Sequence, residues 1–350
     1  MRVFVINPGA TSTKLAVFEE EQPVWSKTLQ HSGADLRPFA HVVDQLPYRR
    51  ALIQAALDEA GYRVSDFDAV AARGGLLRHI PSGTYEVNDR MLRDIYDPPY
   101  GEHASNLGAV LARELADGAR IPAYITDPVS TDEMTEVAHF SGLKGMERES
   151  FFHALNQKAM ARRAAERLGR PYEELRLIVV HMGGGVSVAA HDCGRIVDDY
   201  NVKDEGSFSM DRAGSLPVNA VVNLCFSGKS KAEVKKLLGS EAGVWSYLGT
   251  RDFREVEDRA RSGEREAQMV FDALVYQHCK DIGAMAAVLR FRVDAVVLTG
   301  GMAHSKSLCD AIGDYVGPLA PVLVLPGEAE MEALALGALR VLRGEPAKTY

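Results

Sequence analysis

Two kinds of apolar pattern each occur twice along the chain. An apolar run that breaks at a small polar loop and then resumes occupies residues 2–18, and the same pattern returns over residues 177–190. A shorter apolar run that ends in two glycines occupies residues 68–75 and again residues 294–301. β-Branched residues are frequent in these runs, which predicts strands, and the polar breaks predict hairpins. The order hairpin, strand, hairpin, strand predicts two copies of one architectural unit.

Segments with helical spacing of apolar residues alternate with these strands. Helices are expected over residues 49–61, 105–117, 153–168, 264–290 and 329–343, with another opening near Ser305. A short strand is expected over 121–126, and the polar stretch 131–149 is a candidate hinge. Residues 200–217 are polar and punctuated by glycine, and their length indicates a functional loop. Alternating strands and helices predict an α/β fold, and the hairpins make its sheets mixed.

Length and charge narrow the classes of protein. A chain of 350 residues is too long for one compact core and suits two domains. A formal net charge of −8 argues against a nucleic-acid binder. No apolar run approaches the roughly 18 residues that cross a bilayer, and the first run is too short for a signal peptide. The four cysteines are widely spaced, which favours reduced thiols. We therefore expect a cytoplasmic protein without a membrane or nucleic-acid partner.

The loop from Asn7 to Lys14 is a candidate phosphate site. It lacks the Gly-Lys-Ser/Thr ending of a Walker loop, and a strand follows it where a Walker loop precedes a helix. Its possible ligands are the Asn7 amide, the Lys14 ammonium, the backbone near Gly9 and the hydroxyls of Thr11, Ser12 and Thr13. The alternative is an ordinary polar hairpin turn. A second copy at Gly183, Gly184 and Gly185 favours the phosphate interpretation, because backbone without side chains can approach a polyphosphate closely.

Seven motifs in a fixed order carry a family resemblance. They are INPGATSTK from Ile6, ARGG from Ala72, FHALNQKA from Phe152, HMGGGVSVAAH from His181, FSMDRAGSLP from Phe208, LTGG from Leu298 and PGEAEMEALALGAL from Pro326. Over essentially its full length the chain resembles the acetate and butyrate kinase family, most closely the butyrate branch. That family belongs to the superfamily of sugar kinases, actin and Hsp70-type ATPases. The resemblance implies duplicated actin-like (ribonuclease H-like) ATPase domains, residues 1–150 with 326–350 and a nucleotide-binding 151–325, with the active site in the cleft between them.

The implied reaction transfers a phosphoryl group reversibly from ATP to butyrate or a similar short or branched carboxylate. A carboxylate is already ionised at neutral pH, so catalysis needs in-line positioning and charge neutralisation more than a base. The alternatives are an acetate or propionate kinase and a non-catalytic actin-like regulator that binds nucleotide. A sugar kinase would need an aspartate base, and Asp127 could serve as one. The resemblance also suggests a homo-oligomer, at least a dimer, whose other partners are small molecules.

The resemblance assigns roles to single residues. Arg73 and Arg212 would clamp the carboxylate and the phosphoryl group, although arginines are also common in surface ion pairs. Asp127 would orient Mg²⁺, although an aspartate before proline is also a common turn former. His153, at the opening of a helix, would contact the transferring phosphoryl group as a neutral donor. Glu330 is the favoured second metal anchor, with Glu328 and Glu332 left open.

The remaining expected contacts are to the nucleotide. His181 would touch the phosphates or is simply a histidine at a strand end, and Thr299, Gly300 and Gly301 would lie near the adenosine. The chain departs from the family at Ala10, where a serine is usual, so Thr11 or Ser12 must supply that hydroxyl. Acetate kinases have a second histidine where this chain has Gln157, and they have an HGG motif that is absent after Arg73. Both differences favour the butyrate branch, and the preferred acyl chain stays open.

Overall fold

A computed structural model describes all residues from 1 to 350. The chain divides into two compact units. The first unit comprises residues 1–132, 154–159 and 329–350, and the second comprises 133–153 and 160–328. No helix is both long enough and apolar enough to cross a lipid bilayer.

The first unit contains a mixed sheet of six strands. Its strands are β1 Arg2–Pro8, β2 Ser12–Glu19, β3 Gln22–Gln30, β4 Ala69–Arg73, β5 Thr84–Glu86 and β6 Ala123–Thr126. Their order is β3-β2-β1-β4-β6-β5. The meander β1–β2–β3 is antiparallel, whereas β4 pairs in parallel with both β1 and β6.

The second unit repeats this arrangement with five strands. They are β7 Arg176–Met182, β8 Val186–Asp192, β9 Arg195–Asp199, β10 Ala295–Gly300 and β11 Val322–Pro326, in the order β11-β10-β7-β8-β9. The meander β7–β8–β9 is antiparallel, and β10 pairs in parallel with β7 and β11. Strands β1, β2, β3, β4 and β6 thus match β7, β8, β9, β10 and β11 in order and direction, which confirms the predicted duplication.

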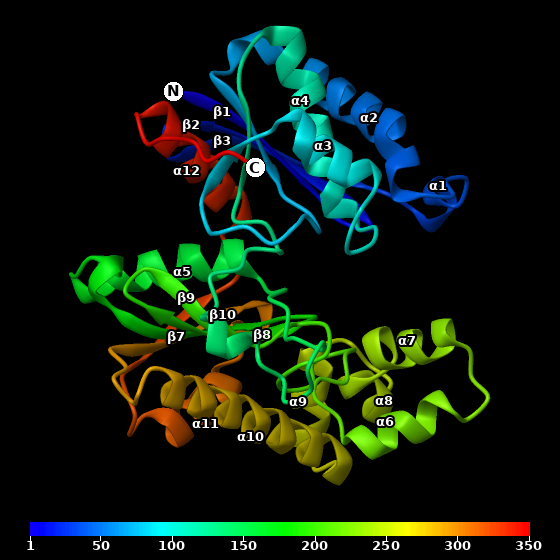
Figure 1. Ribbon diagram of the computed structural model, residues 1–350, viewed down its shortest axis with the longest axis vertical. Coiled ribbons are helices and arrows are strands. Elements are labelled where there is room, and N and C mark those ends of the chain that lie inside the picture. The colour runs from blue at the N-terminus through cyan, green and yellow to red at the C-terminus, as the bar shows by residue number, and fades with distance from the viewer. The chain divides into compact units, whose positions relative to one another are not determined.

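Helices cover both faces of the first sheet, as Figure 1 shows. The helices of this unit are α1 Gly33–Leu36, α2 Leu46–Glu59, α3 Asp89–Tyr96, α4 Leu107–Ala119 and α12 Glu330–Leu342. Phe4, Ile6 and Val70 pack with α2, α3 and α4 in one apolar cluster. Val3 and Val5 point the opposite way, because side chains alternate along a strand, and they pack with α12.

Helix α5, Ala154–Leu168, begins in the first unit and continues into the second. The other helices of the second unit are α6 Val218–Cys225, α7 Lys231–Ser240, α8 Gly243–Leu248, α9 Phe253–Arg261, α10 Arg265–Val288 and α11 Lys306–Val316. One large core joins the sheet to α8, α9, α10 and α11, and α10 and α11 lie together beneath this sheet in Figure 1. Short 3₁₀ turns are η1 Val42–Gln45, η2 Val64–Asp66, η3 Ala104–Asn106, η4 Glu136–His139, η5 Tyr172–Glu174 and η6 Gly301–His304.

The boundary between the units differs from the expected one at residue 150. Residues 133–153 belong with the second unit because their polar groups bind to β9 and the loop after it. The Thr135 amide donates to the Val197 carbonyl at 3.0 Å. The guanidinium of Arg148 is ion-paired with Asp198 and Glu205, at 2.9 and 2.8 Å. No helix or strand interrupts residues 200–217, in agreement with the predicted loop.

Candidate functional site

The first hairpin loop joins β1 to β2 and is closed by a hydrogen bond from the Gly9 amide to the Ser12 carbonyl, 2.7 Å. Asn7 pairs with Lys14 in the ladder. Ala10, Thr11 and Lys14 are exposed, and Gly9 and Ser12 are half-buried. The loop therefore presents the Thr11 and Ser12 hydroxyls and the Lys14 ammonium to solvent.

Thr13 does not fit the expectation of a third available hydroxyl. It is fully buried, because alternation along β2 turns it inward while Lys14 turns outward. Its Oγ1 lies 2.8 Å from Nε2 of His31 and accepts a hydrogen bond from Nη1 of Arg49 at 2.9 Å. Thr13 thus supports the loop from inside.

Arg73 ends β4 and meets Glu330 at the start of α12. Its Nη1 lies 3.0 Å from Oε1 and 3.1 Å from Oε2 of that carboxylate, and Asn7 Nδ2 donates to Oε2 at 2.7 Å. Only Nη1 of the guanidinium is engaged in this way, so Nη2 and Nε stay available to an oxyanion. The first unit therefore brings together Asn7, Arg73 and Glu330, three residues expected at the site.

Tight packing holds the end of β4 in place. A Cβ on Gly75 would lie 2.1 Å from Oδ1 of Asn106, and a Cβ on Gly108 would lie 2.3 Å from the Arg73 carbonyl oxygen. The Leu76 amide donates to Asn106 Oδ1 at 2.8 Å. Helix α4 can therefore approach the backbone beside Arg73 closely, which fixes the position from which that side chain extends.

Asp127 follows β6 and is almost fully buried. Its φ of +40° lies in the left-handed region, which aspartate tolerates better than most residues. Its Oδ1 accepts hydrogen bonds from Ser82 Oγ at 2.7 Å and the Gly83 amide at 2.8 Å. Oδ2 accepts none, so one oxygen is fixed by the protein and the other is left for a ligand.

The second hairpin loop joins β7 to β8 through Gly183, Gly184 and Gly185. The Gly183 amide donates to the Gly185 carbonyl at 3.0 Å. Arg212 packs against this loop, since a Cβ on Gly185 would lie 3.0 Å from its Nη1. The same Nη1 donates to the Val202 carbonyl at 3.0 Å. The second unit therefore places Arg212 beside the triple glycine.

Two predicted histidines lie together in the second unit. The rings of His153 and His181 stack with centroids 3.8 Å apart and planes 15° apart. His153 Nδ1 lies 2.9 Å from Ser187 Oγ, and His181 Nε2 lies 3.7 Å from a Glu328 carboxylate oxygen. His153 is the N-cap residue of α5, as expected from its place at the helix opening.

The loop after β10 combines a buried and an exposed part. Thr299 is fully buried and its hydroxyl donates to the Gly327 carbonyl at 3.1 Å, so its side chain braces the loop and does not face a ligand. Gly300 has a φ of +89°, and a Cβ there would lie 2.3 Å from the Met182 carbonyl oxygen. Only glycine fits this position. Gly301 is exposed and is the part of the motif that a ligand can reach.

The three glutamates considered as metal anchors differ in their surroundings, and Glu332 is half-buried in the first turn of α12. Glu330 is buried beside Arg73 and Asn7. Glu328 is exposed and lies near His181, in the second unit. No group of three or more histidine, cysteine, aspartate or glutamate side chains is arranged to hold a metal ion. Mg²⁺ commonly uses one or two carboxylates together with water and substrate phosphates, so Asp127 with its open Oδ2 suits that ion.

The sequence did not point to several residues that shape these sites. Ser82 and Gly83 fix Asp127 and lie outside every motif considered. Ser187 holds His153 and lies within the motif that begins at His181, but the motif assigns it no role. The Pro81-Ser82-Gly83 run is a turn signal, but nothing in it indicates which carboxylate the turn would meet. Arg49 lies within a predicted helix, and its contact with the first loop depends on how that helix packs.

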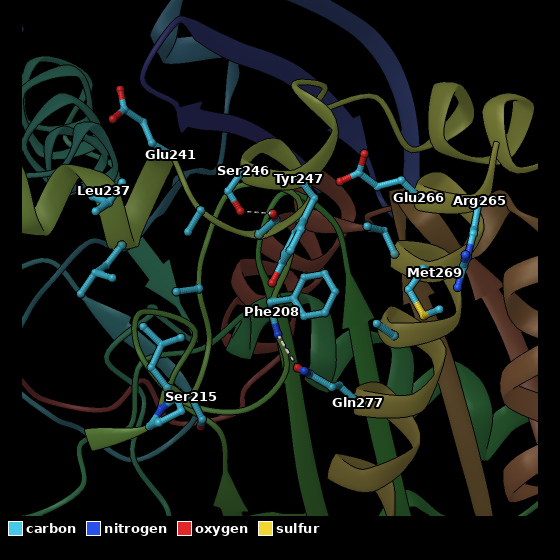
Figure 2. Close-up of a pocket in the computed structure, with 18 residues that line it drawn as sticks. Phe208, Ser215, Leu237, Glu241, Ser246, Tyr247, Arg265, Glu266, Met269 and Gln277 are labelled. Atoms are coloured by element: carbon cyan, nitrogen blue, oxygen red, sulfur yellow. Dashed lines mark hydrogen bonds between the residues drawn. The ribbon is translucent and has the colours of Figure 1, made fainter. Parts of the chain in front are cut away.

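A further cavity of about 890 Å³ lies in the second unit and is shown in Figure 2. The loop containing Phe208 and Ser215, helices α7 and α8, and the start of α10 surround it. Tyr247 and Met269 line it, while the Phe208 amide donates to Gln277 Oε1 at 3.2 Å beneath it. None of the predicted site residues lines this cavity.

Comparison with solved structures identifies the class of fold. An acetate kinase from Porphyromonas gingivalis is 21% identical, with a TM-score of 0.77 over 97% of this chain and 99% of that chain. A propionate kinase from Francisella tularensis is 16% identical, with a TM-score of 0.74 over 95% and 98%. An acetate kinase from Entamoeba histolytica is 14% identical, with a TM-score of 0.78 over 97% and 99%. The fold is the duplicated actin-like ATPase fold that these kinases share.

Part of the amino-acid sequence also matches a known protein family. Residues 143–312 match the model of the acetokinase family. The matched segment lies almost entirely within the second unit and contains the triple-glycine loop, both stacked histidines, Arg212 and the Thr299–Gly301 loop.

Proposed function

We propose that this protein is an ATP-dependent carboxylate kinase of the acetokinase type. A carboxylate oxygen of the substrate attacks the γ-phosphorus, the bond between that phosphorus and the β–γ bridging oxygen breaks, and ADP leaves with the electron pair. The products are an acyl phosphate and ADP, and the reaction is reversible. The observation that carries the proposal is Arg73, whose guanidinium is held by Glu330 through Nη1 alone and keeps two nitrogens for an oxyanion.

The second unit would bind the nucleotide. Its supporting features are the triple-glycine loop with Arg212 against it and the exposed Gly301. His153 and His181 would contact the phosphates, and Ser187 would fix which nitrogen of His153 faces them. In the first unit Asn7, Thr11, Ser12 and Lys14 would contact phosphate oxygens at the hairpin loop.

Asp127 and Glu330 are the residues that would hold Mg²⁺. When bound, the ion would neutralise charge on the phosphates. The chain's own part is to keep each carboxylate oriented, through Ser82 and Gly83 for Asp127 and through Arg73 and Asn7 for Glu330. We also propose a cytoplasmic location, where ATP is available and the four free cysteines stay reduced.

We propose butyrate or a similar short or branched carboxylate as the substrate, with acetate and propionate as equally supported alternatives. The support for butyrate is the pattern around Arg73 and Gln157, where histidines of the acetate branch are absent. An acyl hydroxamate assay with MgATP and acetate, propionate, butyrate, isobutyrate or valerate tests both the carboxylate kinase activity and the preferred substrate. Glucose serves as a control acceptor. A maximum at four or five carbons is expected. A maximum at acetate would overturn the butyrate assignment, and no product with any carboxylate would favour a non-catalytic regulator.

We further propose that the protein self-associates through an apolar surface of the second unit. Helix α6 has no buried residue, and Leu216, Val218, Val222 and Phe226 on and beside it are 41%, 74%, 46% and 86% exposed. Tyr247 and Met269, on the cavity of Figure 2, are 62% and 59% exposed. An apolar helix left uncovered in water is unfavourable, which indicates that another surface covers it.

The partner proposed for this apolar surface is a second copy of the chain. The six side chains expose on the order of 700 Å² of mostly apolar surface, close to the roughly 800 Å² per partner of a stable interface. Leu216 lines the cavity just before α6 begins, so each copy offers both an apolar helix and an apolar groove to its partner. Phe226→Asp is expected to yield a monomer by light scattering after size-exclusion chromatography. Tyr315→Asp, on α11, is the control that keeps the oligomer. A monomeric wild type would overturn the proposal.

A further inference from the structure

Arg49 is a buried cation without a carboxylate partner. It lies on α2, its side chain is fully buried, and it reaches beneath the first hairpin loop. Nη1 donates to the Gly9 carbonyl at 3.0 Å and to Thr13 Oγ1 at 2.9 Å. Nε and Nη2 donate to Gln45 Oε1 at 3.0 and 2.9 Å, and Nη2 also approaches the Ala10 carbonyl at 3.5 Å. Every acceptor is neutral.

The groups around Arg49 supply no compensating charge. His31 contacts Thr13 through Nε2 and lies 3.2 Å from the Tyr48 hydroxyl through Nδ1. Burial, and then the charge of Arg49, lower the pKa of His31, so this ring is neutral at pH 7. Burial also raises the pKa of Tyr48, so its phenol stays protonated.

A buried charge without a counter-charge is expensive, and proteins usually pair it. Burial lowers the pKa of Arg49, but a guanidinium remains charged at neutral pH. Burying the charged guanidinium of Arg49 therefore costs desolvation free energy, and only hydrogen bonds to neutral acceptors offset that cost. The exposed side of that loop presents Thr11, Ser12 and Lys14, the groups proposed to contact phosphate.

We propose that Arg49 is a positioning residue for phosphate binding at the first loop. Its hydrogen bonds to Gly9 and Thr13 set the loop's shape, and its charge attracts the anion that binds on the outer side. The bound phosphoryl group is the counter-charge that the protein itself lacks. This inference rests on the proposed function for the loop, and it concerns the phosphate side of that function alone.

The test compares Arg49→Met and Arg49→Lys with Arg50→Met. Arg50 is the adjacent residue, exposed and paired with Glu114 at the surface, so its replacement changes net charge equally without touching the loop. Thermal unfolding is measured with and without inorganic pyrophosphate, and the KM values for ATP and carboxylate are measured separately.

Arg49→Met is expected to lose most of the pyrophosphate-induced rise in unfolding temperature and to raise KM for ATP at least tenfold, with a smaller change in KM for carboxylate. Arg49→Lys keeps the charge but loses the planar fork, and it should recover part of both effects. Arg50→Met should match the wild type. If Arg49→Met does not fold, the proposal is tested by comparing the pyrophosphate-induced rise in unfolding temperature of Arg49→Lys with that of the wild type.

A pyrophosphate response and an ATP KM that are unchanged in both Arg49 variants would overturn the proposal. So would a wild type that does not respond to pyrophosphate at all. A wild type that responds, an Arg49 variant that does not, and no carboxylate phosphorylated would support the inference and refute the kinase assignment. Failure of the Arg49 proposal and failure of the kinase assignment therefore give different results.

Discussion

Gly185→Ala tests the contact between the triple-glycine loop and Arg212. The added Cβ would lie 2.7 Å from Val202 Cγ2 and 3.0 Å from Arg212 Nη1. Val202 cannot turn away easily, because a β-branched side chain has few rotamers and its amide is bonded to the Phe151 carbonyl at 2.8 Å. Since Arg212 Nη1 donates to the Val202 carbonyl, displacing the valine moves the arginine as well.

The expected magnitude follows from this overlap. Extra volume in a packed site typically costs about 1–3 kcal/mol. For a unit of this size, each kcal/mol lowers the unfolding midpoint by roughly 2–4 °C, so we expect a loss of about 2–12 °C. A displacement of Arg212 by about 1 Å would reduce kcat/KM on the order of a hundredfold if it clamps a reacting group.

Gly184→Ala is the matched control one residue earlier. A Cβ there meets nothing within 4 Å, so the unfolding midpoint should not change. If phosphates approach that backbone, as proposed, KM for ATP should rise without any loss of stability. The assays are scanning calorimetry and acyl hydroxamate formation. A Gly185→Ala variant with the wild-type midpoint and kcat/KM would refute the reasoning, and equal destabilisation of both variants would show that the Val202 contact is not its cause.

Three further predictions concern Arg73 and two titratable groups on α10, the half-buried Asp281 and the fully buried His278. Arg73→Ala should lower kcat/KM by roughly a hundredfold or more while nucleotide binding survives, and near-normal turnover would refute the clamp. Burial raises the pKa of Asp281 to about 6, so stability is lost as the pH rises through 6. Asp281→Asn should therefore unfold like the wild type near pH 4 but be more stable at pH 8 by on the order of 3 kcal/mol, and a constant difference would contradict this. Burial lowers the pKa of His278 to about 4, so the folded state resists its protonation and stability is lost as the pH falls from about 6.5 towards 4. Over that pH range His278→Gln should lose less stability than the wild type. Parallel pH profiles of the two unfolding midpoints would contradict this expectation.

Much of the fold was predictable because its strands are buried apolar runs. The duplicated hairpins, the strand before Gly74 and the strand before Gly300 all have the short apolar pattern that a buried strand requires. Strand β3, Gln22–Gln30, was not predicted, because it is an edge strand with no fully buried residue. Helix α6 likewise has no fully buried residue.

The motifs located candidate residues but not their partners. That Arg73 meets Glu330 depends on α12 returning to the first sheet more than 250 positions later in the chain, and no local pattern encodes such a contact. The inward turn of Thr13 was predictable from strand alternation once Lys14 is taken as outward. The burial of Thr299 follows from its place in β10, which is buried along its whole length and pairs in parallel with a strand on each side.

The duplication gives a chain with a net charge of −8 two hairpin loops at which the proposed phosphate contacts would be made. Each sheet presents a hairpin loop at the corresponding place, and an arginine lies against each loop. Arg49 reaches the first loop from a helix and Arg212 reaches the second from a long irregular segment, so the two arginines are not equivalent in the repeat. Both donate to neutral acceptors and neither is paired with a carboxylate. Local positive charge is thus supplied at two loops by side chains from different elements, while the rest of the surface can remain acidic without weakening either site.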